Sequence, residues 1–294
     1  MLRSDGHNTK TLQKLNVLII GAGAISETLG QSLLSSGAKV TLVTNQVKAK
    51  QNFSSVPYLN VTNRDDFLLE STIYSVDIVI FAARPDRWED STTLSKLLRR
   101  LLKLKPRQII LLSSSAIYGD SPIPFSETTL PTPVNHYGKS RLDLENVFKD
   151  FYQESQLTIL RISNVFGHHK LNSIVEEIAR LIKNSRYAEL DLDPQILRDY
   201  LHIEDLILSL MMCILDSTEG CFNVSSGIGV SGGSLVSLVN DRFALKFTTK
   251  MHHNLQNVAR CVVLDNSKFR VKFSWSPREP LSGISGYIES YIGR

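Results

Sequence analysis

The stretch NVLIIGAGAIS, residues 16–26, decides the fold class, because an apolar run leads directly into closely spaced glycines. Its first five residues are typical of a buried β-strand. The letters GAGAIS then follow the pattern G-x-G-x-x-G, with Ser26 at the third glycine position. Gly21 would permit a tight turn, and Gly23 would let the backbone approach a diphosphate at the start of the next helix. The stretch therefore predicts a dinucleotide site; the alternative is a glycine turn that binds nothing.

The same apolar character returns at intervals along the first half of the chain. Further buried strands are predicted at residues 39–43, 77–82, 108–113 and 157–162, and helices at 25–36 and 137–152. These strands are continuous runs without alternation, as expected where helices cover both faces of a sheet. Strand–helix alternation at this spacing predicts an α/β protein with a doubly wound parallel sheet, the Rossmann arrangement.

The pattern becomes less regular after Asn164, and this sets the expected domain boundary. We expect a mobile tail over residues 1–12, a dinucleotide-binding domain over 13–164, and a smaller C-terminal substrate lobe over 165–294. Helices at 172–184, at 204–215 and after Pro280, with strands near Tyr200 and at 221–224, are predicted for this last part. The lobe should be partly interleaved with the sheet and close over its C-terminal edge, where such sheets bind ligands.

Composition excludes several classes of protein. The chain has 294 residues, 42% hydrophobic and 21% charged, and a mild net charge of +4, as in ordinary globular proteins. Its basic run RRLLKLKPR is typical of a solvated helix face, so nucleic-acid binding is not expected. Three scattered cysteines argue against a disulfide framework or a metal site and favour a reducing compartment. Neither a signal peptide nor a membrane-spanning run is recognisable, which predicts a cytoplasmic protein.

Residues after the second predicted strand bear on the choice of cofactor. A carboxylate about 20 residues beyond the glycines commonly holds the ribose of NAD. Here the strand ends in Thr44 and Asn45, with Lys48 and Lys50 beyond. Without the carboxylate a 2′-phosphate is not repelled, and the lysines would attract it. This favours NADP over NAD; the alternative is that both lysines are merely exposed.

A serine-rich strand end and a helical tyrosine supply the candidate reacting groups. The strand at 108–113 continues into SSSAIYGD, which would place hydroxyls at the edge where the dinucleotide is expected. Those hydroxyls could instead only cap neighbouring backbone groups. One loop later comes HYGKSRLDLE, residues 136–145, in which helical spacing puts Tyr137 and Arg141 on one face. A phenol beside a fixed cation is a candidate acid/base group, or else a surface tyrosine on an ordinary helix.

Together these motifs resemble the extended short-chain dehydrogenase/reductase family, which comprises nucleotide-sugar epimerases, dehydratases and reductases. The resemblance covers nearly the whole chain. SSSAIYGD is similar to the family's serine-bearing strand, and SETTLPTPVNHYGKSRLDLE to its segment E…P…P…YGxSKxxxE. LRISNVFG at 160–167 and LRDYLHIEDL at 197–206 are similar to its LRxxNVYG and RDYIHVDDL segments. GCFNVSSG, VVLDNSK and FSWSP resemble its C-terminal part.

The resemblance implies a role for each matching position. Ser114 would hydrogen-bond the reacting sugar oxygen, and Tyr137 would give or take its proton while hydride moves to or from the nicotinamide. Ser115 and Asn164 would bind substrate, and Arg198 would pair with its diphosphate unless it forms a structural salt bridge. The residues expected at the cofactor are Gly21, Gly23, Ala24, Ile25, Asn45, Ala82, Tyr137 and Arg141. The implied protein is a homodimer that reduces or epimerises a nucleotide-diphosphate sugar, and the short lobe favours the reductase.

Departures from the family pattern bear on these roles. Arg141 stands where the family has a lysine that binds the nicotinamide ribose and favours the ionised tyrosine. An arginine keeps the charge but has a larger planar head, so we expect a shifted cofactor contact or weakened chemistry. The alternative function is therefore a non-catalytic NAD(P)-binding scaffold or sensor. The loop after VFG is also shortened to HHKLNS, where His168 and His169 are either substrate contacts or plain loop residues.

Overall fold

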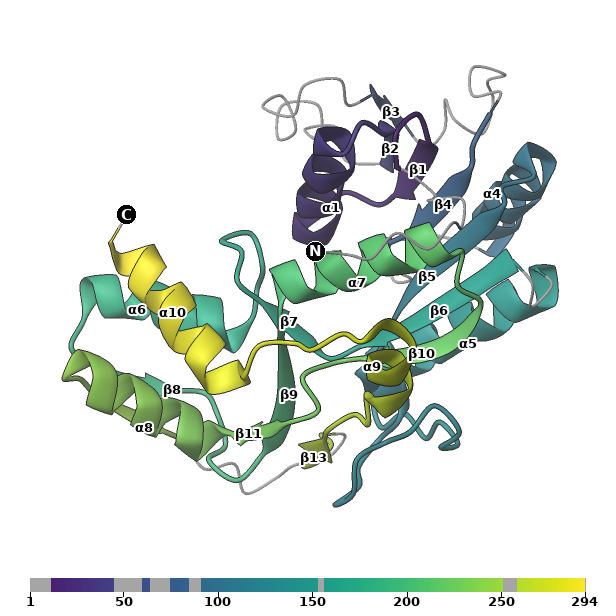
Figure 1. Cartoon of the computed structure of the whole chain (residues 1–294). Coiled ribbons are helices and arrows are strands. Elements are labelled where there is room, and N and C mark those ends of the chain that lie inside the picture. The colour runs from purple at the N-terminus through teal and green to yellow at the C-terminus, as the bar shows by residue number, and fades with distance from the viewer. Residues whose placement is uncertain are drawn as a thin grey trace.

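A seven-stranded, wholly parallel sheet forms the centre of the molecule, which confirms the predicted fold class (Figure 1). The structure is a computed structural model that describes residues 12–44, 60–63, 75–84, 91–152, 156–250 and 258–293. Across the sheet the strands are β10 (Gly220–Val224), β6 (Leu157–Ile162), β5 (Gln108–Ser114), β4 (Ile78–Phe81), β1 (Asn16–Ile20), β2 (Lys39–Thr44) and β3 (Asn60–Asn63). The chain winds outward from β1 to β3 and then returns to β4 on the other side of β1. Ligands of open α/β sheets bind at such a reversal.

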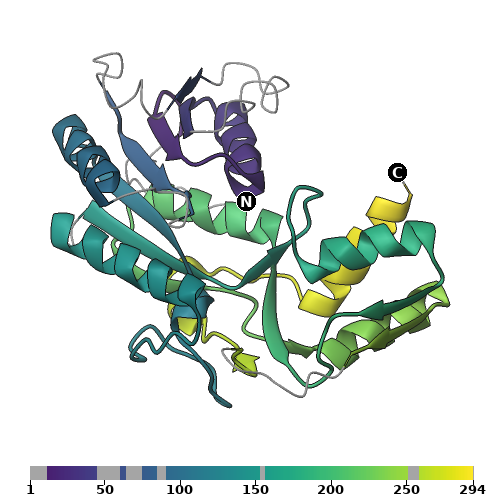
Figure 2. The same ribbon diagram turned by 180° about the vertical axis from the view of Figure 1, so that it is seen from behind.

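Helices cover both faces of this sheet, as the continuous apolar strands predicted (Figures 1 and 2). One face carries α1 (Ala24–Ser35) and α7 (Ile203–Asp216), and the other carries α4 (Ser91–Leu104) and α5 (His136–Phe151). Successive β1 residues alternate between the two cores: Ile19 faces α1 and α7, whereas Leu18 and Ile20 face α4 and α5. The basic run 99–107 thus lies largely on α4, whose Leu97, Leu98 and Leu101 side chains are buried.

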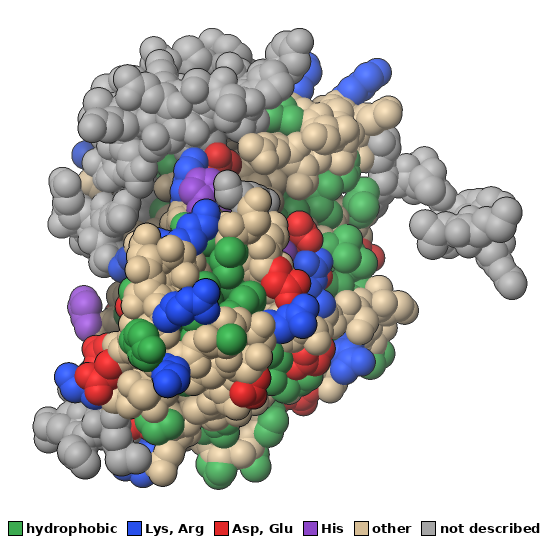
Figure 3. Space-filling model, turned by 90° about the vertical axis from the view of Figure 1, so that its left-hand side faces the viewer, with side chains coloured by type: hydrophobic (Ala, Val, Ile, Leu, Met, Phe, Trp, Pro, Cys, Tyr) green, Lys and Arg blue, Asp and Glu red, His purple; other side chains and the backbone are tan. Residues whose placement is uncertain are grey.

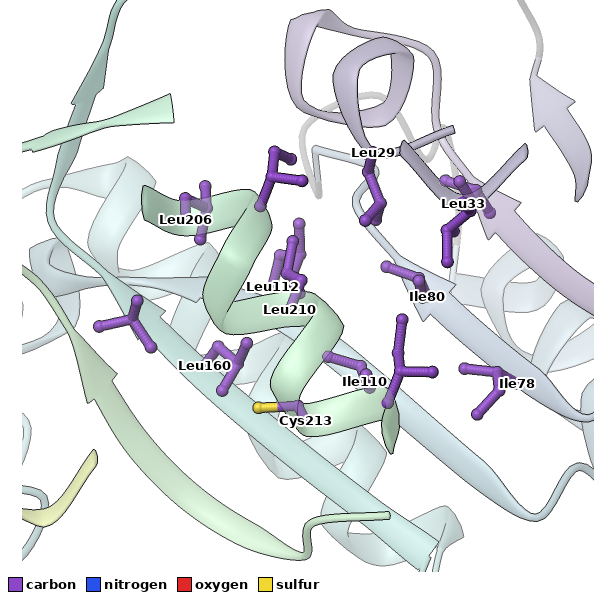
Figure 4. Packing of buried hydrophobic residues seen from close by; sticks show 14 of the residues in the cluster. Leu29, Leu33, Ile78, Ile80, Ile110, Leu112, Leu160, Leu206, Leu210 and Cys213 are labelled. Carbon is purple, nitrogen blue, oxygen red and sulfur yellow. The ribbon is translucent and has the colours of Figure 1, made fainter. Parts of the chain in front are cut away.

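The core under α1 and α7 shows how the sheet is covered. Figure 4 shows Leu29 and Leu33 of α1, and Leu206, Leu210 and Cys213 of α7, packed over Ile78, Ile80, Ile110, Leu112 and Leu160 of the sheet. Each large aliphatic side chain gains about 1.5–3 kcal/mol from complete burial. Residues of α1 and α7, which are far apart in the sequence, therefore share one core.

A second group of elements begins after the sheet strand β6. It contains one sheet of β7 (Asn164–Phe166), β9 (Leu197–His202), β11 (Gly229–Ser231) and β13 (Cys261–Val262), and a pair of β8 (Tyr187–Leu190) and β12 (Lys246–Thr249). Helices α6 (Ile174–Asn184), α8 (Gly232–Phe243) and α10 (Pro280–Ile292) enclose a separate apolar core there, and α9 (Ser267–Phe273) packs on β10. Between these elements the chain returns through α7 and β10 to the central sheet.

Neither the surface charge nor the cysteines of the described residues point to a particular function. No helix in the described segments is long and apolar enough to cross a membrane. On the face seen in Figure 3, acidic and basic side chains are interspersed and do not form one basic stripe. Cys213, Cys221 and Cys261 are free cysteines, and burial raises the pKa of each thiol.

Candidate active site

A cavity of about 1000 Å³ lies at the carboxyl ends of β1, β4 and β5, where the winding of the sheet reverses. Its walls come from the central sheet and from the second group of elements. Most of the predicted site residues line it: Gly21, Gly23, Ala24, Ile25, Ala82, Ser114, Tyr137, Arg141, Asn164 and Arg198. Residues from positions 21 to 198 of the sequence are thus gathered in one place.

One predicted site residue within the described segments is not among those that line the cavity. Ser115 was predicted to contact substrate, but β5 ends at Ser114 and the chain turns there into the short helix η2 (Ser115–Ile117). Ser115 is buried in that turn and does not line the cavity. Asn45, like Lys48 and Lys50, lies outside the described residues.

The glycine turn after β1 has the conformation that a dinucleotide site requires. Gly21 has a φ of +107°, and an added Cβ would lie 2.7 Å from the Ala83 nitrogen, so no larger residue fits. Gly23 has an extended backbone at the start of α1, and an added Cβ there would meet nothing within 4 Å. The first backbone N–H groups of a helix lack partners within it, so the cavity meets a ready set of donors for an anion. These residues fit the diphosphate of a dinucleotide.

An added Cβ would clash at Gly21 but not at Gly23, and this difference gives a prediction. Gly21→Ala should lower the free energy of unfolding by about 2 kcal/mol, because it forces a positive φ and a clash with the main chain. Gly23→Ala should leave stability within about 0.5 kcal/mol but weaken cofactor binding roughly tenfold, because its methyl group enters the open cavity. Urea denaturation and dinucleotide titration check the pair. Equal stability losses would contradict the assignment of the turn.

Tyr137 is held at the cavity by the first turn of α5. The Asn135 side chain caps the helix by accepting from the Gly138 N–H at 2.8 Å. Gly138 packs so closely on the turn after β5 that an added Cβ would lie 2.2 Å from the Ala116 oxygen. This close contact brings the start of α5 against the end of β5, so Tyr137 and Ser114 line the same cavity.

Arg141 contacts Tyr137 one helical turn away, as the spacing predicted. Its Nε donates to the Tyr137 hydroxyl at 3.2 Å, and its Cζ lies 5.3 Å from the centroid of the phenol ring. Its Nη1 donates to the carbonyl oxygens of Leu112 at 3.0 Å and Ala83 at 3.3 Å. The guanidinium is buried and so ties the phenol to the ends of β4 and β5.

The two serines at the end of β5 have different roles: the Ser113 hydroxyl is used within a buried network, and the Ser114 hydroxyl can still donate to a ligand. Ser113 donates to Glu145 at 2.5 Å, within a buried network in which Arg161 contacts both carboxylate oxygens, at 3.2 and 2.9 Å. Ser114 accepts from the Ala116 N–H at 3.2 Å and so caps the turn, while it also lines the cavity. A hydroxyl that accepts one bond still has a donor to offer to a ligand. The capping and substrate-binding readings of Ser114 are therefore compatible.

Arg198 and Asn164 line the cavity from the paired strands β9 and β7. Asn164 donates to the Asp199 carbonyl at 3.0 Å. The Arg198 guanidinium donates to the carbonyl oxygens of Leu197 at 2.8 Å and Ala259 at 2.6 Å. Burial lowers the pKa of Arg198, and within the described segments no carboxylate forms an ion pair with it. The salt-bridge alternative is thus not observed there, and an anionic ligand would offset the cost of burying this charge.

The shortened loop after β7 faces the glycine turn. Lys170 from this loop lines the cavity and forms a 2.7 Å ion pair with Glu27 in the first turn of α1. His168 and His169 stack with ring centroids 4.5 Å apart and do not line the cavity, which favours their reading as loop residues. The described residues contain no group of three or more histidine, cysteine, aspartate or glutamate side chains that could hold a metal ion.

The family of the chain follows from its match to a family model. Residues 17–224 match the model described as "NAD dependent epimerase/dehydratase family". The chain belongs to the NAD dependent epimerase/dehydratase family. This confirms the resemblance inferred from the motifs, and the matched range runs from the glycine strand β1 to the edge strand β10.

Individual members of the epimerase/dehydratase family agree with this assignment. A UDP-glucose 4-epimerase of Halalkalibacterium halodurans is 26% identical over 301 residues, covering 88% of this chain and 90% of that protein. The crystal structure of a Thermotoga maritima UDP-glucose 4-epimerase with UDP-glucose has a TM-score of 0.80 at 22% identity, covering 95% and 99% of the chains. A Bacillus anthracis dTDP-glucose 4,6-dehydratase in complex with NAD has a TM-score of 0.80 at 17% identity, covering 94% and 97%. These structural likenesses show the fold.

Two basic residues at the cavity were not singled out from the family pattern. Arg84 follows β4, and its Cζ lies 5.9 Å from the centroid of the Tyr137 ring. Lys170 lies in the shortened loop, where the histidines had drawn attention instead. Arg84 could have been identified from the sequence by its position directly after a predicted strand. Lys170 could have been identified as the one lysine in the shortened loop.

Proposed function

We propose that this protein is an NAD(P)-dependent 4-epimerase of a nucleotide-diphosphate sugar, in which Tyr137 moves the proton of the reacting hydroxyl. The observation that carries the proposal is one cavity lined by the glycine turn, by Ser114 and by the Tyr137–Arg141 pair. The names of the curated relatives support epimerisation over 4-keto reduction, which was favoured by the short lobe.

In this proposal the proton transfer is carried out by residues that line the cavity. A bound nicotinamide cofactor would supply reversible hydride transfer. Tyr137 takes the proton of the sugar hydroxyl at its phenolic oxygen and later returns it to the same sugar oxygen. Arg141 places a fixed positive charge beside that phenolic oxygen, and this charge would offset the negative charge on the oxygen whenever it has given up its proton. Ser114 donates its free hydroxyl hydrogen to the sugar oxygen and keeps it oriented.

The part of the cavity lined from β7 and β9 would hold the nucleotide part of the substrate. Arg198 presents a guanidinium whose planar fork suits a diphosphate, and among the described residues its hydrogen-bond acceptors are carbonyl oxygens. Asn164 offers an exposed amide beside it. A diphosphate there would leave the sugar to reach across the cavity toward Tyr137. We also propose a homodimer, which light scattering would test.

The decisive assay uses NAD and a panel of UDP-linked sugars. Incubation with UDP-glucose, UDP-N-acetylglucosamine or UDP-glucuronate should convert one of them to its 4-epimer, detected by chromatography. A parallel arm with NADPH and nucleotide-linked 4-keto sugars would register a reductase as loss of nicotinamide absorbance. Titration with NAD and NADP tests the preference for NADP suggested by Lys48 and Lys50. No turnover in either arm, with cofactor binding intact, would refute both enzymatic readings.

The second candidate is a non-catalytic cofactor-binding scaffold, which the replacement of the family's lysine by Arg141 favours. We expect Arg141→Lys to lower kcat about tenfold, because the single nitrogen of a lysine cannot take the positions of both Nε, which contacts the Tyr137 hydroxyl, and Nη1, which contacts the Leu112 and Ala83 carbonyls. Cofactor affinity should change less than kcat. A sharp rise in activity in Arg141→Lys would instead mean that the natural residue impairs turnover and would favour the scaffold.

A further inference from the structure

The dinucleotide side of the cavity is bridged by an ion pair between two distant parts of the chain. Lys170 Nζ lies 2.7 Å from the Glu27 carboxylate, although the two residues are 143 positions apart. Glu27 belongs to the first turn of α1, and its N–H donates to the carbonyl of Gly23, which lines the cavity. Lys170 lines the cavity from the loop between β7 and α6. The pair therefore connects the two walls next to the expected diphosphate position.

The pair is screened less than a fully exposed ion pair because one partner is largely buried. The Glu27 side chain is 10% exposed and that of Lys170 is 39% exposed. Charge pairs in such partly buried positions are screened less by water and salt than fully exposed pairs. A negative carboxylate at this helix end would also repel a diphosphate, so its neutralisation by Lys170 favours an anionic ligand.

Hydrogen bonds within the loop that carries Lys170 hold this residue near Glu27. The buried Glu176 carboxylate accepts from the Gly167 N–H at 2.8 Å and from the Ser173 hydroxyl, and thereby fixes both ends of the loop. Between them, the Lys170 N–H donates to His168 Nδ1 at 3.2 Å, and the following N–H donates to the His168 carbonyl at 2.8 Å. Burial lowers the pKa of His168, which favours the neutral ring that can accept this hydrogen bond. Lys170 is thus presented by a compact loop.

We propose that the Lys170–Glu27 pair is a clasp that closes the cavity beside the cofactor diphosphate and retains the dinucleotide through turnover. The inference rests on the proposed function, since it assumes a dinucleotide at the glycine turn. An epimerase returns the hydride to its substrate and needs no exchange of cofactor, whereas a reductase must release oxidised cofactor after each turnover. A clasp of this kind therefore fits an epimerase. Lys170 and Glu27 act as positioning residues and take no part in proton transfer.

A charge-reversal cycle measures the clasp directly. The wild type and the variants Glu27→Lys, Lys170→Glu and Glu27→Lys/Lys170→Glu are loaded with NADH or NADPH, whichever the wild type binds more tightly. Release is followed by nicotinamide fluorescence after addition of excess oxidised cofactor. Each single variant places like charges together and should release cofactor about tenfold faster. The double variant restores the pair and should release at nearly the wild-type rate, which is a non-additive result.

The outcomes separate the clasp from a direct contact of Lys170 with phosphate. Lys170 could instead act only as a cation that attracts the phosphate. In that case Glu27→Lys adds a second cation and slows cofactor release, and the effects of the two substitutions on the release rate are additive. That result would overturn the clasp but leave the proposed function intact. A wild type that retains neither dinucleotide would overturn both.

A matched ion pair elsewhere in the molecule serves as the control. Arg242 Nε lies 2.6 Å from the Glu289 carboxylate, joining α8 to α10 away from the cavity. Arg242→Glu also reverses one charge of a pair and should leave the release rate unchanged. Accelerated release in this control would mean that general loosening of the second group of elements, and not the clasp, governs retention.

Discussion

Replacement of Tyr137 by phenylalanine is expected to lower kcat by about 10²- to 10⁴-fold while cofactor binding stays within a factor of about three. The substitution removes only the hydroxyl that accepts from Arg141 Nε, and the phenyl ring keeps its place beside the guanidinium. The loss therefore falls on proton transfer and not on the shape of the site. KM should change little, because the phenol contributes mainly to the reacting step.

A matched tyrosine makes this experiment specific. Tyr187 lies on β8, is 66% exposed and does not line the cavity, so Tyr187→Phe should leave kcat unchanged. Epimer formation and dinucleotide titration are measured for both variants. Full activity in Tyr137→Phe would remove the phenol from its proposed role, whereas loss of cofactor binding would point to a collapsed site.

Arg161→Met should be the most destabilising single change that we predict, with a loss of about 3–5 kcal/mol in the free energy of unfolding. Glu145 is fully buried, and Arg161 is its close ionic partner at 2.9 Å. Burial opposes the charge of Arg161, but the hydrogen bonds and charge of Glu145 outweigh it and raise the pKa of the guanidinium. Its removal leaves a buried carboxylate with the Ser113 hydroxyl as its nearest remaining donor. Urea denaturation measures the loss.

Two further variants test whether the unpaired charge is the cause. Lys149→Met removes the other cation near Glu145, 3.6 Å away but 46% exposed, and should cost no more than about 0.5 kcal/mol. Arg161→Met combined with Glu145→Leu removes both charges and should recover part of the lost stability. A double variant as unstable as the sum of its single changes would show that packing, and not charge, dominates at this position.

The fold was predictable because its evidence is local. A run such as residues 17–20 is apolar and buried at every position, as expected for a strand in a sheet that is covered on both faces. The contact of Arg141 with Tyr137 was equally predictable, because helical geometry alone brings residues four positions apart together. Most residues assigned to the cavity followed from motifs in strand ends, which parallel topology gathers at one edge.

The remaining features depend on contacts that no local pattern records. Ser115 follows Ser114 directly, but the end of β5 is set by the turn that Ser114 caps, and one position separates a cavity residue from a buried one. The Lys170–Glu27 pair joins a loop to a helix that is 143 positions away in the sequence. The sequence around either residue therefore gives no sign of its partner. The division of roles between Ser113 and Ser114 likewise depends on Glu145, one helix away.

The place of β10 at the edge of the central sheet has a consequence for how the chain is made. Synthesis from the N-terminus completes β6 long before α7 and β10 emerge, so a nascent chain ending near residue 164 carries β6 with an open edge. Its Ile110 and Leu160 side chains would lack the cover that α7 later provides. Such a fragment should be a substrate for holding chaperones and should fold cooperatively only after residue 224 has left the ribosome.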